Sequence, residues 1–353
     1  MSIKLLFLGD ISFNDQYEQL LTEQNTFNAI SKLTTKSDYV IGNLECFCES
    51  HTGENTLKVP RLKTTENALH HLKDLNLDLV SLANNHAYDN LTDGFEKTVA
   101  ILKQQQINYL GAGTTHESCI TPHIATIQNK TFCFLNYVTH DTNPNIPEDA
   151  SFHLNWYQFD KVKKSIKVLR NRYDYIILLL HWGGDVENLW MPNLEQPKQA
   201  KELIAAGADL IIGHHTHTFQ PWEIINNRPV FYSIGNFCFD TQFKFENPEL
   251  QNFSSGIVQV SFNSNHVRSK VFPIISELLE IKQDHALKTQ LLLFLKNFIF
   301  KWIKTYPKLG HFIKFLNLAY LYKRNVLTGQ SSYKKLKSII SKLKKYSIKY
   351  LKI

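Results

Sequence analysis

Five short apolar runs, each ending at residues that can bind a cation, constrain the fold of this chain more than any other feature. The runs cover residues 3–8, 39–41, 79–82, 175–180 and 210–212. Runs of this length that are rich in Ile, Leu and Val are typical of buried strands. In an open α/β sheet, ligands bind beyond the carboxyl ends of the strands. We therefore expect loops that are distant in the sequence to converge on one site.

Helical patterns separate these runs. Apolar residues at spacings of three and four predict helices over residues 65–75, 94–105, 161–170 and 195–206. Three asparagine-containing turns predict hairpins late in a sheet. They are Asn129 with Lys130, Asn226 with Asn227, and Asn263 to Asn265. The alternation of strands and helices predicts an α/β fold with antiparallel additions.

The residues that end the apolar runs form a mixed oxygen and nitrogen donor set. In chain order they are Asp10, Asn43, Glu45, Asn84, Asn85, His86, Asp89, His181, His215 and His217. Neutral imidazole is the commonest metal ligand, and one intervening residue lets a single loop supply two nitrogens. Such a set suits manganese, iron or zinc. The alternative is a group of ordinary polar residues in loops, which is the less favoured interpretation because five separate runs end in the same way.

The motifs GDI, GNLE, LANNHAYD, HWG, GADLIIGHHTH and YSIGNFCFD occur in this order within residues 3–262. This arrangement resembles the capsule synthesis CapA family, a branch of the calcineurin-like metallophosphoesterases. The resemblance implies a four-layer αββα sandwich with two mixed β-sheets and a two-metal site where the strands end. By position, the metal ligands would be Asp10, Glu45 as the bridge, Asn85, His181, His215 and His217. His86 would be the histidine beside the scissile bond, with Asp89 orienting its ring.

Three positions depart from the pattern. Ser12 stands where metallophosphoesterases at large carry a histidine, and Glu45 stands where they usually carry aspartate. Asp185 in HWGGD replaces the glutamate that is more frequent in the family, and we expect it to orient a ligand at most. These departures leave open whether two ions bind with equal affinity.

The expected chemistry is that of a dinuclear hydrolase. Two divalent ions about 3.5–4 Å apart lower the pKa of a bridging water, giving a hydroxide at neutral pH, and neutralise the departing oxygen. Manganese or iron is the favoured pair, with zinc as the alternative. Proton donation by His86 would contribute about 10²–10⁴ in rate. We expect Asn43, Asn84, Ser233 and Asn236 to contact substrate, the alternative for Ser233 and Asn236 being simple packing beside the cleft.

Composition predicts one large α/β domain with an appendage. The chain has 353 residues, of which 43% are hydrophobic and 20% charged. We assign residues 1–275 to the metallophosphoesterase-like domain and residues 276–353 to a helical, lysine-rich extension. Five scattered cysteines argue against a disulfide framework and favour a reducing compartment. Cys46 and Cys48 are expected to be buried thiols without a role in chemistry.

The two ends of the chain bear on where the protein works. The start, MSIKLLFLGD, has the pattern of neither a signal peptide nor an anchor. The run from Leu291 to Ile303 is shorter than the ~20 apolar residues of a spanning helix. We therefore expect a cytoplasmic protein, peripheral at the inner face of the membrane.

Residues 331–353 contain eight lysines and no acidic residue. Leu336, Ile339, Ile340 and Leu343 share a helical face opposite lysines, a pattern typical of an interfacial helix on anionic lipid. Contact with an acidic polymer is an equivalent expectation, and the alternative is a solvated helix packed on the domain. Nucleic acid is not an expected partner.

These features support three hypotheses. The first is a metal-dependent, phosphoesterase-like hydrolase of capsule or other surface-polymer biosynthesis, acting in poly-γ-glutamate or polysaccharide metabolism on a phosphoester or an anionic polymer. The second is a non-hydrolytic factor that binds the polymer or assembles the synthesis machinery. The third is a relative that no longer binds metal, which Ser12 suggests and the many retained ligands argue against.

Overall fold

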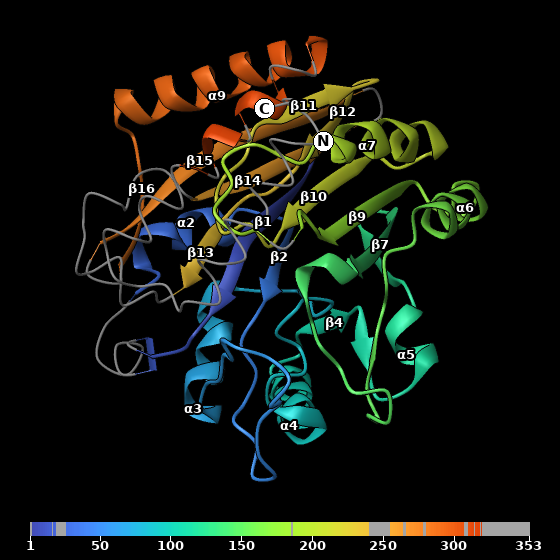
Figure 1. Cartoon of the computed structure of the whole chain (residues 1–353), viewed down its shortest axis with the longest axis vertical. Helices are drawn as coiled ribbons and strands as arrows, with labels where there is room; N and C mark the ends of the chain where they lie inside the picture. Colours follow the sequence, from blue (N-terminus) through green and yellow to red (C-terminus); the bar gives the residue numbers. More distant parts are fainter. Residues whose placement is uncertain are drawn as a thin grey trace.

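Two mixed β-sheets form the framework of the protein, and helices cover their outer faces (Figure 1). The computed structural model describes residues 2–15, 17–18, 26–184, 186–239, 255–263, 266–277, 280–306, 310–313, 315–317 and 319. Residues 331–353 and Asp185 therefore lie outside the described part of the chain. The predicted α/β class with two mixed sheets is confirmed.

The first sheet has the order β16-β15-β14-β1-β2-β3-β4, and β13 also pairs with β1. Its strands are β1 (Ile3–Ser12), β2 (Tyr39–Leu44), β3 (Leu79–Ser81), β4 (Asn108–Leu110), β13 (Asn236–Phe239), β14 (Ser255–Phe262), β15 (Val267–Glu277) and β16 (Glu280–Gln283). Strands β1 to β4 are parallel, whereas β14 to β16 are antiparallel. The parallel half places the ends of β1, β2 and β3 at one edge.

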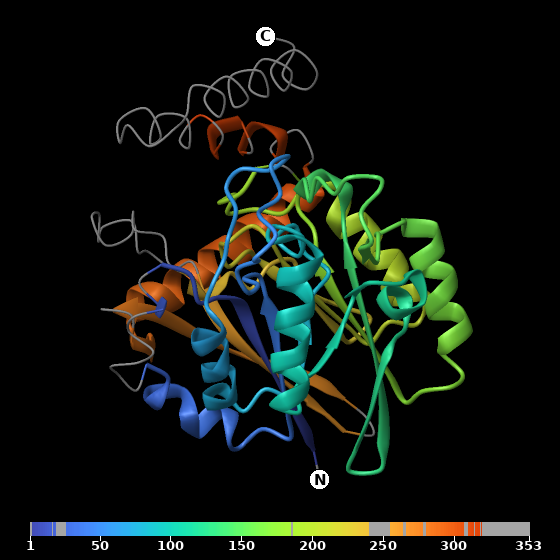
Figure 2. The same ribbon diagram turned by 90° about the horizontal axis from the view of Figure 1, so that it is seen from below.

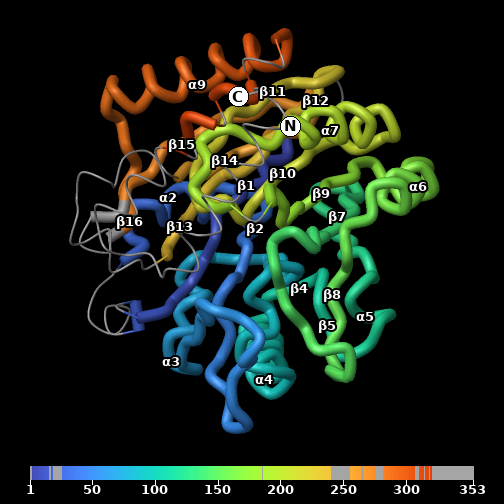
Figure 3. Tube along the Cα trace, viewed as in Figure 1, coloured from blue at the N-terminus to red at the C-terminus, as the bar shows by residue number. Residues whose placement is uncertain are grey.

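The second sheet has the order β11-β12-β10-β9-β7-β6. Its strands are β6 (His123–Ile127), β7 (Lys130–Val138), β9 (Tyr175–His181), β10 (Leu210–His214), β11 (Trp222–Ile225) and β12 (Arg228–Phe231). The central strands β7, β9, β10 and β12 are parallel. A third, two-stranded sheet of β5 (Ala112–Gly113) and β8 (His153–Leu154) lies near α5 (His116–Ile120) and β4 (Figure 3).

Alternate residues of the central strands face different cores. Leu5 and Phe7 of β1 share a buried cluster with Phe134 and Ile177 of the second sheet, so this cluster lies between the sheets. The intervening Leu6 belongs to a cluster with helix residues on the outer face of the first sheet. A strand that is buried on both faces reads as a continuous apolar run, which explains why these strands stand out in the sequence.

The predicted helices are confirmed. They correspond to α3 (Glu66–Leu69) with the 3₁₀ helix η2 (His70–Leu75), α4 (Leu91–Gln104), α6 (Phe159–Leu169) and α7 (Glu195–Ala206). Short α2 (Ser31–Thr34), η1 (Asn28–Ile30) and η3 (His140–Thr142) lie in the connections. Figure 2 shows the N-terminal helices, in blue to cyan, and α6 and α7, in green, on opposite sides of the strands.

Two of the predicted hairpin turns lie fully within the described residues and are confirmed. Asn129 and the Asn226–Asn227 pair adopt positive φ and connect β6 to β7 and β11 to β12. All five cysteines are buried and free, as expected for thiols without a disulfide framework.

The C-terminal extension differs from its prediction. The sequence predicted helix from residue 276, but the expected boundary at 275/276 lies inside β15, and β16 pairs with it. Burial of Ile281 and Ile274 in the core of the first sheet explains why this segment is a hairpin. The helix begins later, as α9 (Leu287–Thr305), and lies along one outer side of the molecule (Figure 1). None of the helices in the described residues meets the length and apolarity needed to cross a membrane.

Candidate metal centre

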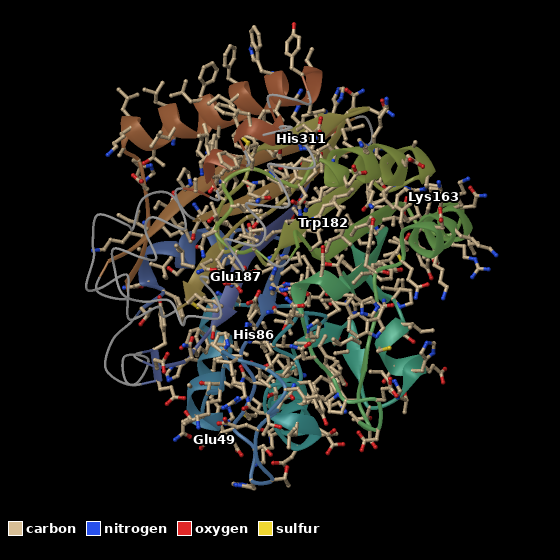
Figure 4. All side chains as sticks on the ribbon, in the orientation of Figure 1. Glu49, His86, Lys163, Trp182, Glu187 and His311 are labelled. Carbon is tan, nitrogen blue, oxygen red and sulfur yellow. The ribbon has the colours of Figure 1, made fainter. Side chains whose placement is uncertain are left out.

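The strand ends bring the predicted ligands together. Asp10 lies in β1 beside Asn43 of β2, and His181 of β9 is paired in register with His214 of β10. Both sheets end their parallel strands at the same place, so oxygen ligands from the first sheet face nitrogen ligands from the second. Figure 4 labels His86 and Glu187 near the middle of the molecule, where these strand ends meet.

Asp10, Glu45 and His217 form the centre of the site. One potential ligand atom from each lies within 4.8 Å of the others, and both carboxylates are fully buried. The Asn43 amide donates to Oδ1 of Asp10 at 2.9 Å and to Oε1 of Glu45 at 2.8 Å. It therefore holds the two carboxylates in a common orientation with one oxygen of each left over.

The pKa shifts of these three residues show how strongly their buried charges act on one another. Burial and the neighbouring charge of Asp10 raise the pKa of Glu45 well above its usual range. Burial also acts to raise the pKa of Asp10, but the hydrogen bond with His214 and the nearby imidazole of His217 outweigh it and hold that pKa well below the usual range. Although burial opposes it, the nearby carboxylates of Asp10, whose Oδ2 lies 3.6 Å from His217 Nδ1, and of Glu45 raise the pKa of His217 to about 10. A bound cation would compensate the same charges.

A second group of predicted ligands lies against the first. His181 Nε2 is 2.8 Å from Oδ1 of Asn85, and His181 Nδ1 is 3.5 Å from Oε1 of Glu45. The rings of His181 and His215 are 4.9 Å apart. His215 Nε2 lies 2.7 Å from the carbonyl oxygen of Gly184, so its N–H donates there and Nδ1 keeps a lone pair.

Four buried atoms in this region have no hydrogen-bond partner among the described residues. They are Oδ2 of Asp10, Oε2 of Glu45, Nδ1 of His181 and Nδ1 of His215. Buried polar atoms are nearly always satisfied, and unsatisfied ones at a cluster of ligands point to an ion. The donor set of oxygens and imidazole nitrogens fits a divalent transition metal, and all five cysteines are accounted for elsewhere as free thiols.

The loop after β10 is held in a strained conformation. His215 and His217 both have positive φ, at 92° and 55°, which non-glycine residues rarely adopt. Gly213 precedes them at a point where a Cβ atom would overlap the carbonyl oxygen of Tyr232. Strain of this kind clusters at functional sites, and here it turns two histidines of one loop into the centre.

His86 and Asp89 lie together beside the ligands, as predicted. His86 Nδ1 is 2.6 Å from Oδ2 of Asp89, which also accepts from the backbone N–H of Leu62. Lys58, which the sequence analysis did not single out, places Nζ 3.0 Å from both His86 Nδ1 and Asp89 Oδ1. Burial and the Lys58 charge lower the pKa of His86 to about 4. The ring is thus fixed through Nδ1.

The residues expected to contact substrate are deeply buried. Asn84 donates to the carbonyl of Leu44 and accepts from the N–H of His86, and Ser233 accepts from the N–H of Gly235. Asn236 Oδ1 lies 2.7 Å from His217 Nδ1. Asn43 bridges the carboxylates as described above. These contacts favour positioning of the ligands and their loops over direct contact with substrate.

Sequence reasoning did not single out three residues that contact or act on the predicted ligands. His214 Nδ1 lies 2.8 Å from Oδ1 of Asp10, and its place in HHTH was the available signal. The charge of Glu187 acts on Glu45, Lys58, His86, His215 and His217, which places it beside the centre. Neither Glu187 nor Lys58 has a spacing that marks it in the sequence.

Hydrogen bonds also define the surroundings of Ser12 and Trp182. The Ser12 hydroxyl is buried and donates to Oδ1 of Asn14 at 2.6 Å, so it does not replace the histidine that is missing at this position. Trp182 is a packing residue, because it is 1% exposed and its indole N–H donates to the carbonyl of Tyr232.

Comparison with known proteins extends these observations. The model of the family described as bacterial capsule synthesis protein PGA_cap matches residues 4–241. The PGA biosynthesis protein CapA of Bacillus subtilis (strain 168) is 28% identical over 249 residues, which are 66% of this chain and 62% of the relative. The capsule biosynthesis protein CapA of Bacillus anthracis is 25% identical over 248 residues, with 67% and 60% coverage. The match thus spans about 60% of the length of these relatives.

A solved structure has a similar fold. A Staphylococcus aureus protein, provisionally assigned as a 5'-nucleotidase and crystallised with α-ketoglutarate, superimposes with a TM-score of 0.50 at 13% identity. The alignment covers 84% of this chain and 58% of that protein. At this identity the likeness concerns the fold alone.

Proposed function

Because this protein belongs to the PGA_cap family of bacterial capsule synthesis proteins, we propose that it is a metal-dependent hydrolase of surface-polymer metabolism. The substrate class that we propose is a phosphoester or an anionic polymer such as poly-γ-glutamate or a capsular polysaccharide. The observation that carries this proposal is the buried cluster of Asp10, Glu45 and His217, with its unpartnered ligand atoms. The helix, sheet, sheet, helix order of the cores supports the four-layer αββα arrangement of metallophosphoesterases.

The residues that would hold divalent ions are Asp10, Glu45, Asn85, His181, His215 and His217. Manganese or iron, or zinc, fits this donor set, and a pair of ions with Glu45 between them is the expected arrangement. The chemistry that such a centre supplies is activation of water and neutralisation of charge on a phosphoryl group. Asn43 and Asn236 hold the ligands in place, because their side chains contact Asp10, Glu45 and His217 directly.

His86 is the residue that we propose to protonate the leaving group. Asp89 fixes the ring through Nδ1, so a proton can be held or released at Nε2. Lys58 balances the charge of Asp89, a carboxylate that is fully buried. These three residues form a unit that positions one nitrogen beside the metal ligands.

A non-hydrolytic role is the second candidate, favoured by the family's description as capsule synthesis proteins, which names no reaction. Ser12 stands in β1 where other metallophosphoesterases have a histidine, and its hydroxyl is already hydrogen-bonded to Asn14. With one ligand fewer at the first metal position, the centre would bind an anionic polymer, or serve in assembly of the synthesis machinery, without cleaving a bond.

The proposed place of work is the inner face of the membrane, with anionic lipid as a peripheral partner of the basic residues 331–353. This proposal rests on the charge of that segment, which has eight lysines and no acidic residue.

Metal analysis tests the proposed function. We expect the protein purified without chelators to contain manganese, iron or zinc, and Glu45→Gln and His215→Ala to lose both the metal and hydrolysis of phosphoesters. His51→Ala is the matched control, because His51 is exposed and should leave both unchanged. Absence of metal after supply with all three ions would contradict the proposal, and metal with saturable polymer binding but no turnover would favour the second candidate.

A further inference from the structure

The helix α9 is apolar on two opposite faces. Leu293, Phe300 and Ile303 are buried against the body of the protein. The other face is exposed: Leu287, Leu291, Phe294, Leu295, Phe298, Trp302 and Tyr306 retain between 41% and 82% of their accessible surface. A helix that is apolar all round is normally buried on all sides, so the outer face calls for a partner.

Four aromatic rings run along this outer face, and we call Phe294, Phe298, Trp302 and Tyr306 the aromatic stripe. Their ring centroids lie 6.4, 6.2 and 5.9 Å apart in sequence order. Figure 4 shows side chains of α9 standing outward from the helix, on the side away from His86 and Glu187. Scattered exposed apolar residues are ordinary, whereas a continuous row of large ones marks an interaction surface.

Contacts on the inner face hold the stripe in this orientation. Asn297 Oδ1 accepts from the backbone N–H of Trp222, and Lys296 Nζ donates to the carbonyl of Phe219. Lys304 pairs with Glu223, and Phe300 packs edge-on against Tyr232. Because four side chains anchor the inner face, α9 cannot turn its stripe into the protein without losing these contacts.

The charge around the stripe identifies the kind of partner. Residues 285–353 contain 16 Lys and Arg and no Asp or Glu, whereas residues 1–284 contain 23 Lys and Arg and 32 Asp and Glu, a net charge of −9. Lys288 and Lys301 are exposed on α9 itself, which contains no acidic residue. Aromatic side chains with lysines at their borders are typical of helices that lie in a membrane interface, and lysines favour anionic headgroups.

We propose that the aromatic stripe of α9 is a surface that docks on an anionic lipid bilayer. The helix lies in the plane of the interface, with Phe294, Phe298 and Trp302 among the headgroups and upper acyl chains. In this orientation the candidate metal centre lies on the side of α9 that faces away from the bilayer. The proposal is independent of whether the centre hydrolyses a substrate.

Vesicle sedimentation with the full-length chain tests this surface. We expect the protein to sediment with vesicles of phosphatidylcholine mixed with phosphatidylglycerol more than with phosphatidylcholine alone. Combining Phe294→Ser, Phe298→Ser and Trp302→Ser should reduce binding about tenfold or more, because buried apolar area supports interfacial binding. The variant keeps every lysine of residues 285–353, so the loss would be assigned to the stripe. Ile120→Ser, Ile124→Ser and Val168→Ser combined is the matched control, since these exposed apolar residues lie elsewhere.

Fluorescence gives a second readout that does not depend on how the triple variant folds. Anionic vesicles should shift the tryptophan emission of the wild type to shorter wavelength, and Trp302→Phe should keep vesicle binding while losing most of the shift. Equal binding by the triple variant and the wild type would overturn the proposal. So would a wild-type protein that stays in the supernatant, or one that self-associates through the stripe without vesicles, which would identify a second copy as the occupant.

Discussion

The buried charges of individual residues distinguish the candidate metal site from an inert protein core. Asp10 and Glu45 are fully buried, and each has an oxygen without a hydrogen-bond partner among the described residues. Placing such a carboxylate in a protein interior costs free energy unless a positive charge compensates it. Within the described part of the chain, buried carboxylate oxygens without a partner occur only here, where histidines from the second sheet also converge.

Replacing Glu45 by Gln should therefore have opposite effects with and without metal. Burial and Asp10 raise the pKa of Glu45 in the folded state, so ionisation destabilises the metal-free protein as pH rises above the usual carboxyl range. At pH 7 in chelator, Glu45→Gln should increase the free energy of unfolding by about 0.5–2 kcal/mol. Chemical denaturation measures this change. A metal-free variant that is less stable than the wild type would contradict the argument.

Lys58 should contribute to stability through Asp89. Its Nζ is buried, 3.0 Å from a carboxylate that is itself fully buried. Lys58→Met removes the cation that balances that carboxylate and leaves it only the hydrogen bonds with His86 and Leu62, so we expect a loss of about 3–5 kcal/mol in the free energy of unfolding. Lys198→Met is the control, because the Lys198–Glu195 pair is exposed and should contribute at most about 1 kcal/mol. Equal effects of the two substitutions would show that the buried pair is not formed.

At the scale of elements, α9 combines two kinds of surface in one helix. Its inner face carries a half-buried lysine, Lys296, whose amino group donates to the carbonyl of Phe219. Burial lowers the pKa of Lys296 to about 8 from its ordinary 10.5. A lysine in this position is easier to bury when it is neutral.

Packing of α9 against the body of the protein should therefore become more stable at alkaline pH. Between about pH 8 and 10.5 the unfolded chain holds a proton at Lys296 that the folded protein has released, so stability rises with pH. Each unit of pKa difference corresponds to about 1.4 kcal/mol. We expect Lys296→Met to remove this part of the pH dependence and to be more stable than the wild type at pH 7. Thermal unfolding of both proteins across this window is the measurement, and parallel curves would contradict the assignment.

At the scale of the whole molecule, the centre joins the two sheets. Asp10 and Glu45 come from the first sheet and its loops, whereas His181, His215 and His217 come from the second. A cation bound to both groups would add a link between halves of the protein that already meet through apolar packing and through hydrogen bonds such as that between Tyr39 and His123. Metal should therefore stabilise the complete fold and not merely one loop.

Removal of metal should lower the melting temperature of the whole protein. A ligand that binds only the native state adds about 2.7 kcal/mol when its free concentration is about 100 times its Kd. We expect a chelator to lower the melting temperature of the wild type and to leave that of Asp10→Asn unchanged. Calorimetry distinguishes one cooperative shift from local loosening. An unchanged wild-type transition would show that no stabilising ion was present.

Much of this protein could be predicted from local sequence. The apolar runs at residues 3–8 and 175–180 identified β1 and β9, because a strand buried on both faces has no polar residues to obscure it. Asp10, Glu45, His181 and His217 were found at the ends of such runs for the same reason. The hairpin of β15 and β16 was missed because apolar residues suit a helix and a strand alike, and pairing of β15 with β14 and β16 at the edge of the first sheet decided between them.

The sequence by itself thus determined which segments become buried strands and which residues stand at their ends, because both depend on short-range periodicity. Only the tertiary structure placed Lys58 against His86 and Asp89, separated from it by about 30 positions. It also decided that α9 presents a second apolar face to solvent, since periodicity cannot tell which of two apolar faces is packed. Burial and pairing of groups far apart in the chain depend on how the layers stack, and that information is not local.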